Sequence, residues 1–332
     1  MSGRLARIGC VLTLAAAAVL PSLPVASSEA PAFDVQAHAG GRGMATGESL
    51  RAFAKALEIG VSTLELDINI TKDDQPLVWH DPVIEPDQCA DTGSAYVGDP
   101  QFPYVGKLVH DLTLAQLRTL NCDKPNNQFP QAEVVRGNKL ATLPEVFALA
   151  DAYHASGPDG VRYNIETKVQ ADHPEMSAGP QEFVDVILAA VRSAGKADSV
   201  EIQSFDWRTL PLVRQTDPAI PLVVLWNQQT WVADSPWLAG VNPAVVSDPM
   251  IGALMIGANV LSPNYGLVDG EAFVSRAHAL GLKVIPWTID DPETMRQQIS
   301  FGADGIITNY PLLLRSVLAE LGMPLPRSYR RE

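Results

Sequence analysis

The sequence predicts an α/β fold, a (β/α)8 TIM barrel, and three observations support that prediction. Short apolar runs rich in β-branched residues recur along the chain, and helical patterns separate most of them. Eight such runs fit within about 300 residues, a usual size for this fold. No glycine-rich phosphate fingerprint follows the first run, which disfavours the rival architecture, a doubly wound open sheet. The eight predicted strands are FDVQAH, STLELDI, VRYNIET, VEIQSF, PLVVLW, ANVLSP, KVIPWT and GIITNY.

The segment before the first strand has the features of an export signal. Arg4 and Arg7 form a short basic region, an apolar core follows, and small residues come after it. We therefore predict that residues 1–28 are a signal peptide and that the protein is secreted or delivered to the periplasm or cell envelope. The barrel domain is predicted over residues 31–320. An uncleaved membrane anchor is the alternative, but no later run reaches the roughly 20 apolar residues of a spanning helix, so no stable membrane span is expected.

Amphipathic periodicity predicts helices between the strands. The first, SLRAFAKALEIG, places Leu50, Phe53, Ala54 and Leu57 on one face and ends at Gly60, which we interpret as the C-cap. Three more stretches follow the same pattern: GPQEFVDVILAAVRSAG, DGEAFVSRAHALG and DPETMRQQISFG. Strands and helices therefore alternate, as a parallel barrel requires.

A ninth apolar run, PLVWH, does not fit this alternation. Only a few polar residues separate it from LELDINI, too few for a crossover helix, so it must return as an antiparallel hairpin partner. A turn centred on Asp73 and Asp74 would place His80 opposite Asp67. Glu65 lies two residues before Asp67 and therefore faces the same side of the strand. The hairpin would thus bring an imidazole and two carboxylates to the carboxyl-terminal mouth of the barrel, where barrel enzymes carry out catalysis.

A long stretch with little periodicity, residues 82–140, follows the hairpin. It starts at the catalytic end of the barrel, so we expect an insertion that covers the mouth as a lid. Cys89 and Cys122 lie in this stretch, and Cys10 would leave with the signal peptide. In an oxidising compartment the two remaining cysteines are predicted to form a disulfide, with two free thiols as the alternative.

Further polar residues gather at the predicted mouth. His38 ends the first strand, Glu166 and Lys168 end YNIETK, and Gln203 ends VEIQS. Together with the hairpin residues they supply three carboxylates, and oxygen ligands favour a hard divalent cation, Ca²⁺ or Mg²⁺, over zinc. The imidazoles would then be free for proton transfer.

The acidic balance of the chain excludes some partners. Its net charge is −14 and its isoelectric point is near 4.8, which argues against a nucleic-acid or anionic-membrane surface. A small-molecule ligand is the expected partner, and the sequence does not predict an oligomeric state.

Taken together, the motifs resemble those of the glycerophosphodiester phosphodiesterase family, within the phosphatidylinositol-phospholipase-like phosphodiesterase superfamily. The matching stretches are HAGGRG, LELDINITKDD, VWHD, NIETK, QSFDWRTL, VIPWTIDDP and DGIITNYP. The resemblance implies an enzyme, a phosphoric diester hydrolase, that uses a divalent cation to hydrolyse a glycerophosphodiester to an alcohol and glycerol phosphate.

The resemblance also implies roles for the residues at the mouth. Glu65, Asp67 and Glu166 would hold the cation as a Lewis acid and template. His38 and His80 would act as the general base and general acid on either side of the phosphorus.

Five residues are expected to bind substrate: Lys168, Arg42, Gln203, Phe205 and Trp287. Lys168 would neutralise charge on the phosphoryl oxygens, and the two aromatic residues would form an apolar wall. Arg42 is included because the family usually opens with His-Arg-Gly, whereas Ala39 follows the histidine here. The family's Pro-Glu-Asn-Thr is replaced by residues 46–49, where Thr46 is expected to cap a helix that begins near Glu48.

Two other functions remain open from the sequence. A lysophospholipase D or sphingomyelinase D-like enzyme could use the same barrel, although the spacing usual for the latter after the second histidine is absent. A non-catalytic phosphate-ester binding protein is the third reading, which the intact histidine pair and carboxylates disfavour.

Overall fold

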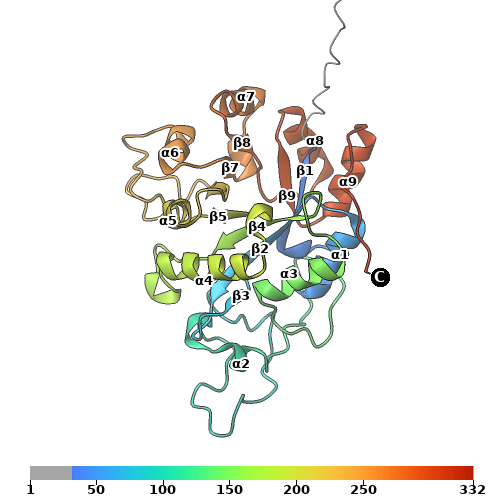
Figure 1. Cartoon of the computed structure of the whole chain (residues 1–332), viewed down its shortest axis with the longest axis vertical. Coiled ribbons are helices and arrows are strands. Elements are labelled where there is room, and N and C mark those ends of the chain that lie inside the picture. Colours follow the sequence, from blue (N-terminus) through green and yellow to red (C-terminus); the bar gives the residue numbers. More distant parts are fainter. Residues whose placement is uncertain (1–31, 332) are drawn as a thin grey trace, which may run out of the picture. The chain divides into compact units, whose positions relative to one another are not determined.

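A computed structural model describes residues 32–331, and the predicted signal peptide lies outside this range (Figure 1). Eight parallel strands form a nearly closed barrel in the order β8-β7-β6-β5-β4-β2-β1-β9, which confirms the predicted fold class. Each of the eight runs predicted as strands coincides with one of them, although β2 extends two residues beyond its run. Their bounds are β1 Asp34–Ala37, β2 Thr63–Ile70, β4 Arg162–Thr167, β5 Val200–Ser204, β6 Leu222–Trp226, β7 Val260–Pro263, β8 Lys283–Val284 and β9 Gly305–Thr308.

The barrel closes between β8 and β9 without a regular ladder. Pro286 follows the short β8 and has no N–H to donate, which limits strand pairing there. Hydrogen bonds still join the two segments, because the Asp304 N–H donates to the Val284 oxygen at 2.9 Å and the Ile307 N–H donates to the Pro286 oxygen at 3.1 Å. The two segments are therefore joined by hydrogen bonds although they do not form a regular ladder.

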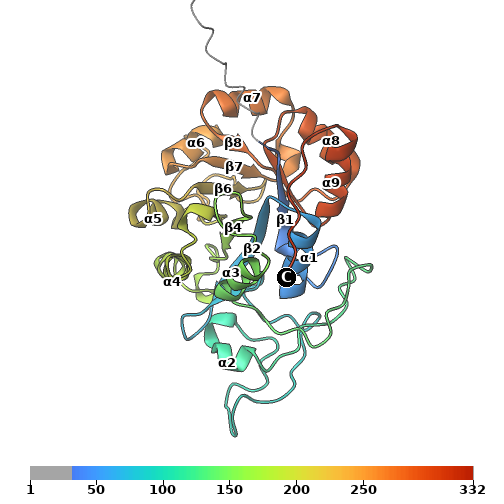
Figure 2. The same ribbon diagram turned by 45° about the vertical axis from the view of Figure 1, so that its right-hand side comes forward.

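Helices surround the strands (Figures 1 and 2). Helix α1 begins one residue after Ser49, whose hydroxyl accepts from the Ala52 N–H at 3.1 Å. Ser49 rather than Thr46 is thus the cap, and the prediction of a helix beginning near Glu48 is wrong by two residues. Leu50 is also exposed, not part of the buried face. The helices are α1 Leu50–Ile59, α2 Leu114–Leu117, α3 Leu143–Ala152, α4 Pro180–Ser193, α5 Thr209–Thr216, α6 Pro249–Ile256, α7 Glu271–Ala279, α8 Pro292–Ser300 and α9 Pro311–Glu320.

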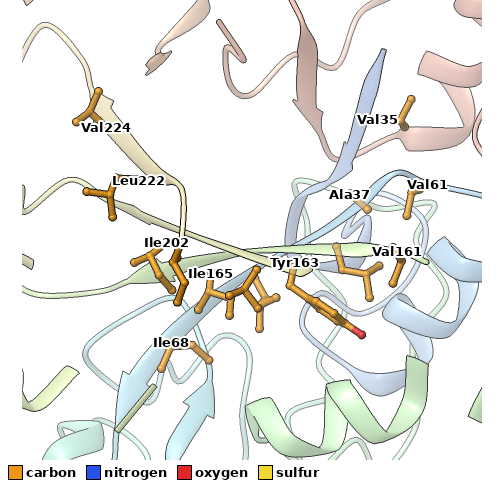
Figure 3. Packing of buried hydrophobic residues seen from close by; sticks show 14 of the residues in the cluster. Val35, Ala37, Val61, Ile68, Val161, Tyr163, Ile165, Ile202, Leu222 and Val224 are labelled. Carbon is orange, nitrogen blue, oxygen red and sulfur yellow. The ribbon is translucent and has the colours of Figure 1, made fainter. Parts of the chain in front are cut away.

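Side chains on the outer face of the barrel pack against these helices. Figure 3 shows Tyr163, Ile165, Ile202 and Leu222 close together on neighbouring strands, and all four are buried. The Tyr163 ring meets Phe147 of α3 edge to face, with ring centroids 4.8 Å apart. Each large side chain buried in this way contributes about 1.5–3 kcal/mol to folding.

The inner face of the barrel is divided by chemistry. Val223, Val260, Ile285 and Ile307 form an apolar cluster on the side of β6 to β9. On the side of β1, β2, β4 and β5, alternate positions carry buried polar side chains instead. These positions point inward because successive residues of a strand face opposite sides of the sheet.

The polar half of the interior is one hydrogen-bonded chain of side chains. Gln36 donates to Glu201 at 3.1 Å, and Asn164 donates both to Gln36 at 2.8 Å and to Gln203 at 3.1 Å. Gln203 in turn donates to Glu65 at 2.7 Å. The chain therefore connects the amino-terminal end of the barrel with a carboxylate at its mouth.

The predicted hairpin is present, with a register shifted by one residue. Strand β3 (Pro76–Val78) pairs antiparallel with β2, and Ile68 lies opposite Val78. The Trp79 N–H donates to the Asp67 oxygen at 3.0 Å, so Trp79, and not His80 as predicted, lies opposite Asp67. The shift arises because the loop has three residues, ending at Asp74 with φ of 55°, instead of two centred on Asp73 and Asp74.

The segment 82–140 lies on one side of the barrel, with α2 and the short 3₁₀ helix η2 (Val109–Asp111) as its helices (Figures 1 and 2). It has a small core of its own, which includes Tyr104, Leu112 and Leu117 and reaches Trp79 of the hairpin. Cys89 and Cys122 are joined by a disulfide within this core. The segment is therefore an insertion near the mouth, as the sequence predicts.

The last described residues return to the amino-terminal end of the barrel. Arg315 of α9 donates to the Gly60 oxygen at 2.8 Å and to the Pro326 oxygen at 2.7 Å. The Tyr329 N–H donates to the Leu57 oxygen at 2.9 Å, at the end of α1. Within residues 32–331, no helix is both long enough and apolar enough to cross a bilayer.

Candidate active site

A cavity of about 690 Å³ opens at the mouth of the barrel. Side chains from the β1–α1 loop, the ends of the strands and the insertion line it. The lining includes nine of the residues predicted for the site: His38, Arg42, Glu65, His80, Glu166, Lys168, Gln203, Phe205 and Trp287. The tenth, Asp67, is fully buried beside them.

Three candidate ligand atoms lie close together in this site. They belong to His38, Glu65 and Asp67, and all lie within 4.8 Å of one another. Glu65 accepts hydrogen bonds from the Ala39 N–H at 2.9 Å and from Gln203. Neither oxygen of Asp67 has a hydrogen-bond partner among residues 32–331. The one ion pair, with Lys168 Nζ, is long at 3.6 Å, and a buried carboxylate without a close hydrogen-bond donor is costly, so these oxygens fit a bound cation.

Glu166 lies differently from the other two predicted metal ligands. Its Oε1 accepts a hydrogen bond from Lys168 Nζ at 2.8 Å, and the same nitrogen lies 3.6 Å from Asp67 Oδ1. Burial raises the pKa of Glu166 to about 7, although Lys168 opposes this. Burial would raise the pKa of Asp67 as well, but Lys168 and the two histidines hold it well below its usual value. Lys168 thus neutralises part of the carboxylate charge.

A fourth buried acid, Glu48, belongs to this group and was not predicted. One oxygen accepts the His80 N–H at 3.1 Å, and the other has no partner among the described residues. Burial and the neighbouring Asp67 raise the pKa of Glu48 well above its usual value. Glu48 lies in a loop and has a φ of 58°, so the loop conformation sets the direction of its side chain. Hydrophobic periodicity therefore could not predict that Glu48 belongs to this group.

His38 is held by a neutral group. Its Nδ1 lies 2.6 Å from Asn309 Oδ1, while the Asn309 amide nitrogen donates to Asp290 at 2.6 Å. Because Asn309 presents its oxygen, the His38 proton is on Nδ1 and Nε2 keeps a lone pair. Burial lowers the pKa of His38 to about 4, so the ring is neutral at neutral pH. Asn309 follows β9 within DGIITNYP, and its place after a strand was the signal that could have identified it.

His80 is held by a charged group. Its Nδ1 lies 2.8 Å from Asp81 Oδ1, and its side chain is 45% exposed. Burial would raise the pKa of Asp81, but the hydrogen bond with His80 lowers it, so Asp81 is a carboxylate at neutral pH. The hydrogen bond to Asp81 fixes the orientation of the His80 ring.

The predicted substrate-binding residues divide into two groups. Arg42, Lys168, Phe205 and Trp287 present side chains to the cavity, and the rings of the last two meet edge to face at 5.3 Å. The Gln203 amide, by contrast, is used on both sides by Glu65 and Asn164. It therefore supports a carboxylate of the site.

Comparison with known proteins identifies the family. Residues 38–313 match the Glycerophosphoryl diester phosphodiesterase family. The chain belongs to this family. The predicted enzyme class, phosphoric diester hydrolase, is confirmed with it. Members of the family depend on a divalent metal, and the grouping of His38, Glu65 and Asp67 could hold one.

Relatives of similar length share this assignment. A glycerophosphodiester phosphodiesterase of Caldanaerobacter subterraneus is 26% identical over 288 residues, covering 87% of this chain and 98% of the relative. One from Bacillus subtilis is 27% identical over 290 residues, covering 85% of each chain. The solved structure of a Silicibacter pomeroyi protein is 26% identical with a TM-score of 0.74, covering 90% of this chain and 96% of that one. An Oleispira antarctica phosphodiesterase solved with the product sn-glycerol-3-phosphate shares the fold, at 19% identity and a TM-score of 0.64, covering 86% of this chain and 96% of that one.

Proposed function

We propose that the protein is an exported phosphodiesterase that hydrolyses small glycerophosphodiesters to an alcohol and glycerol phosphate, with a divalent cation and a pair of histidines. One observation carries the proposal. His38 and His80 face one cavity, and their Nδ1 atoms are bound by an amide oxygen and a carboxylate, respectively. This difference supports opposite roles in proton transfer.

His38 would be the general base. Its ring is neutral, and Asn309 fixes the proton on Nδ1, so Nε2 can accept a proton from the attacking hydroxyl. His80 would be the general acid, because Asp81 accepts from Nδ1 and orients the ring so that Nε2 can donate a proton to the leaving alcohol. Each histidine is thus held by its Nδ1, which leaves Nε2 for the reaction.

The carboxylates would hold a cation, which we propose to be Ca²⁺ or Mg²⁺. Glu65, Asp67 and Glu166 would supply oxygen ligands, and the lack of a close hydrogen-bond donor to Asp67 among the described residues supports a cation at this point. When bound, the cation would act as a Lewis acid on the phosphoryl group. Lys168 and Arg42 would balance the charge of the phosphate, and Phe205 and Trp287 would contact the apolar face of the glycerol.

A substrate panel with a chelator arm tests this function. The protein is given glycerophosphocholine, and the release of glycerol phosphate is measured after exhaustive chelation and after adding back Ca²⁺ or Mg²⁺. We expect chelation to abolish turnover and one of these ions to restore it. Full activity after chelation would refute the metal assignment. Faster turnover of lysophosphatidylcholine would instead indicate a lysophospholipase D, and binding without turnover would indicate a binding protein.

Export is a separate part of the proposal. It rests on the basic, apolar and small-residue order of residues 1–28. Mass spectrometry of the mature protein after cell fractionation tests it. We expect a new amino terminus near residue 28 and recovery outside the cytoplasm. A full-length protein in the cytosolic fraction would contradict it.

A further inference from the structure

Arg42 lies in the loop after β1 and lines the cavity, but residues of the insertion hold its side chain. Its guanidinium carbon lies 5.0 Å from the centre of the Phe129 ring. One terminal nitrogen donates to the Gln128 side chain at 3.4 Å, and Nε is buried with no hydrogen-bond partner in the described part of the chain. Phe129 and Gln128 are more than eighty residues away in the sequence, so the contact depends on how the insertion folds back.

The insertion is fastened to this loop by several independent contacts. The Thr46 N–H donates to the Glu133 oxygen at 2.8 Å, and the Glu133 N–H donates to the Met44 oxygen at 3.1 Å. The Glu133 carboxylate also forms ion pairs with Lys55 at 3.1 Å and Arg51 at 3.3 Å, both on α1. The segment around Phe129 is thus fixed relative to the loop that carries Arg42.

An aromatic ring holds an arginine without using its hydrogen-bond donors. A carboxylate partner would occupy the N–H groups, whereas stacking on a ring leaves the edge of the planar guanidinium available for an anion. Phe129 is itself buried, and its ring centroid lies 6.0 Å from that of Tyr310. The ring is therefore a firm support that limits the rotamers of Arg42 before substrate binds.

We propose that Phe129, assisted by Gln128, is a positioning residue that holds the Arg42 guanidinium toward the phosphate of the substrate. The insertion would thereby set the affinity for the phosphate group, while the histidines and the carboxylates carry out the reaction. This inference rests on the proposed function, in which Arg42 binds the phosphate.

Steady-state kinetics of Phe129→Leu on glycerophosphocholine tests the inference. We expect KM to rise about three- to tenfold and kcat to stay within about twofold, because the lost contact orders Arg42 and touches no reacting atom. The inhibition constant of sn-glycerol 3-phosphate should rise by the same factor. Phe129→Tyr keeps an aromatic ring, so its KM and its inhibition constant should both stay near the wild-type values. Phe102→Leu, at an aromatic residue of the insertion that does not line the cavity, should change neither.

A double variant shows whether Phe129 acts through Arg42. Adding Phe129→Leu to Arg42→Ala should raise KM no further than Arg42→Ala alone. If Phe129→Leu raises KM by the same factor whether or not Arg42 is present, the inference is overturned. An unchanged KM in Phe129→Leu alone would also overturn it. If Phe129→Leu does not fold, Gln128→Ala is the test instead, because Gln128 is exposed and its substitution should not disturb folding. We expect this variant to raise KM about twofold, and an unchanged KM would overturn the inference. An inactive wild-type protein would refute the proposed function, which separates the two failures.

Discussion

At the residue scale, the two histidines of the site are distinguished by what their Nδ1 atoms contact. Asn309 is neutral and Asp81 is charged, so the two rings have different electrostatic surroundings. His38 nevertheless lies within 4.8 Å of Glu65 and Asp67, which makes it a potential ligand as well as a base. The two roles predict different results when the ring is removed.

Replacing either histidine separates catalysis from metal binding. We expect His38→Ala and His80→Ala each to lower kcat by about a hundredfold or more, because each would remove one of the two proposed proton-transfer steps. Cation affinity, measured by calorimetric titration, should stay near the wild-type value. The double variant should lose much less than the product of the two single losses, since the residues act as one unit.

The opposite results would contradict these roles. A large loss of cation affinity in His38→Ala would show that this ring is a ligand. A His80→Ala variant that kept its rate would remove His80 from the mechanism.

The sequence predicted which residues at strand ends would lie at the cavity. Glu65, Glu166 and His38 were foreseeable because β-strand alternation and the common direction of parallel strands place them at one mouth. Glu48 and Asp290 could not be foreseen, because loop geometry directs their side chains. The pairing of Glu166 with Lys168 was also missed, since spacing alone does not decide whether a carboxylate contacts a cation or a neighbouring lysine.

At the element scale, alternate positions of four strands form the hydrogen-bonded chain that ends on Glu65. Gln203 is its last member before the site, and it orients a predicted ligand in the way that outer residues orient metal ligands in other proteins. The chain thus makes part of the barrel interior a support for the mouth.

Removing the Gln203 amide should therefore weaken metal binding. We expect Gln203→Leu to lower cation affinity about ten- to a hundredfold, because Glu65 loses its fixed orientation. Calorimetric titration with Ca²⁺ or Mg²⁺ measures this. Gln298→Leu is the matched control, at a buried glutamine of α8 whose amide contacts backbone oxygens. Equal affinities in the two variants would show that the chain has only a structural role.

The disulfide is an element-scale feature of the insertion. Cys89 and Cys122 are joined, and Cys10 would leave with the proposed signal peptide, so intact-mass analysis of the mature protein without reduction should find no thiol that iodoacetamide can alkylate. After reduction, two should appear. Two alkylatable thiols before reduction would contradict the bridge and leave the insertion without its cross-link.

Elements with clear periodicity were predicted well, and others were not. Helix α6 is apolar on all sides, with Ile251, Leu254 and Met255 exposed, so it gave no amphipathic pattern. The hairpin was predicted from chain length, but its register depended on whether the loop had two or three residues. That choice is set by the left-handed conformation of Asp74, which the sequence does not specify.

At the scale of the whole barrel, the buried chain has a second carboxyl group at its other end. Glu201 lies near Asp34 and Arg162 at the amino-terminal end of the barrel. Burial, with a contribution from Asp34, raises the pKa of Glu201 to about 7. Between about pH 4.5 and 7, Glu201 therefore keeps its proton in the folded protein, whereas in the unfolded chain a glutamate of ordinary pKa has released it.

This proton links folding stability to pH. The pKa of Glu201 is raised in the folded state. The stabilisation that this group gives the folded state is therefore complete below about pH 4.5 and is lost as the pH rises through about 7. From the size of the shift, we expect the wild-type free energy of unfolding to fall by about 3 kcal/mol more than that of Glu201→Gln between pH 4.5 and 8. Urea denaturation of both proteins, with the disulfide intact, measures the difference. Parallel curves would show that Glu201 is ionised in the folded state.

The fold class was predictable because each strand and helix repeats one pattern, and errors in single elements do not change the alternation. The irregular seam between β8 and β9 was not predictable, because a strand of only two residues followed by a proline has too little sequence pattern to show where pairing stops.

The docking of the last residues against the end of α1 has a practical consequence. Arg315 and Tyr329 hold the chain at the end of the barrel opposite the cavity. A linker joined after Arg331 would therefore leave the molecule on the side away from the substrate entrance. The protein could be attached to a solid support or to a second enzyme through this end without obstructing the approach of substrate.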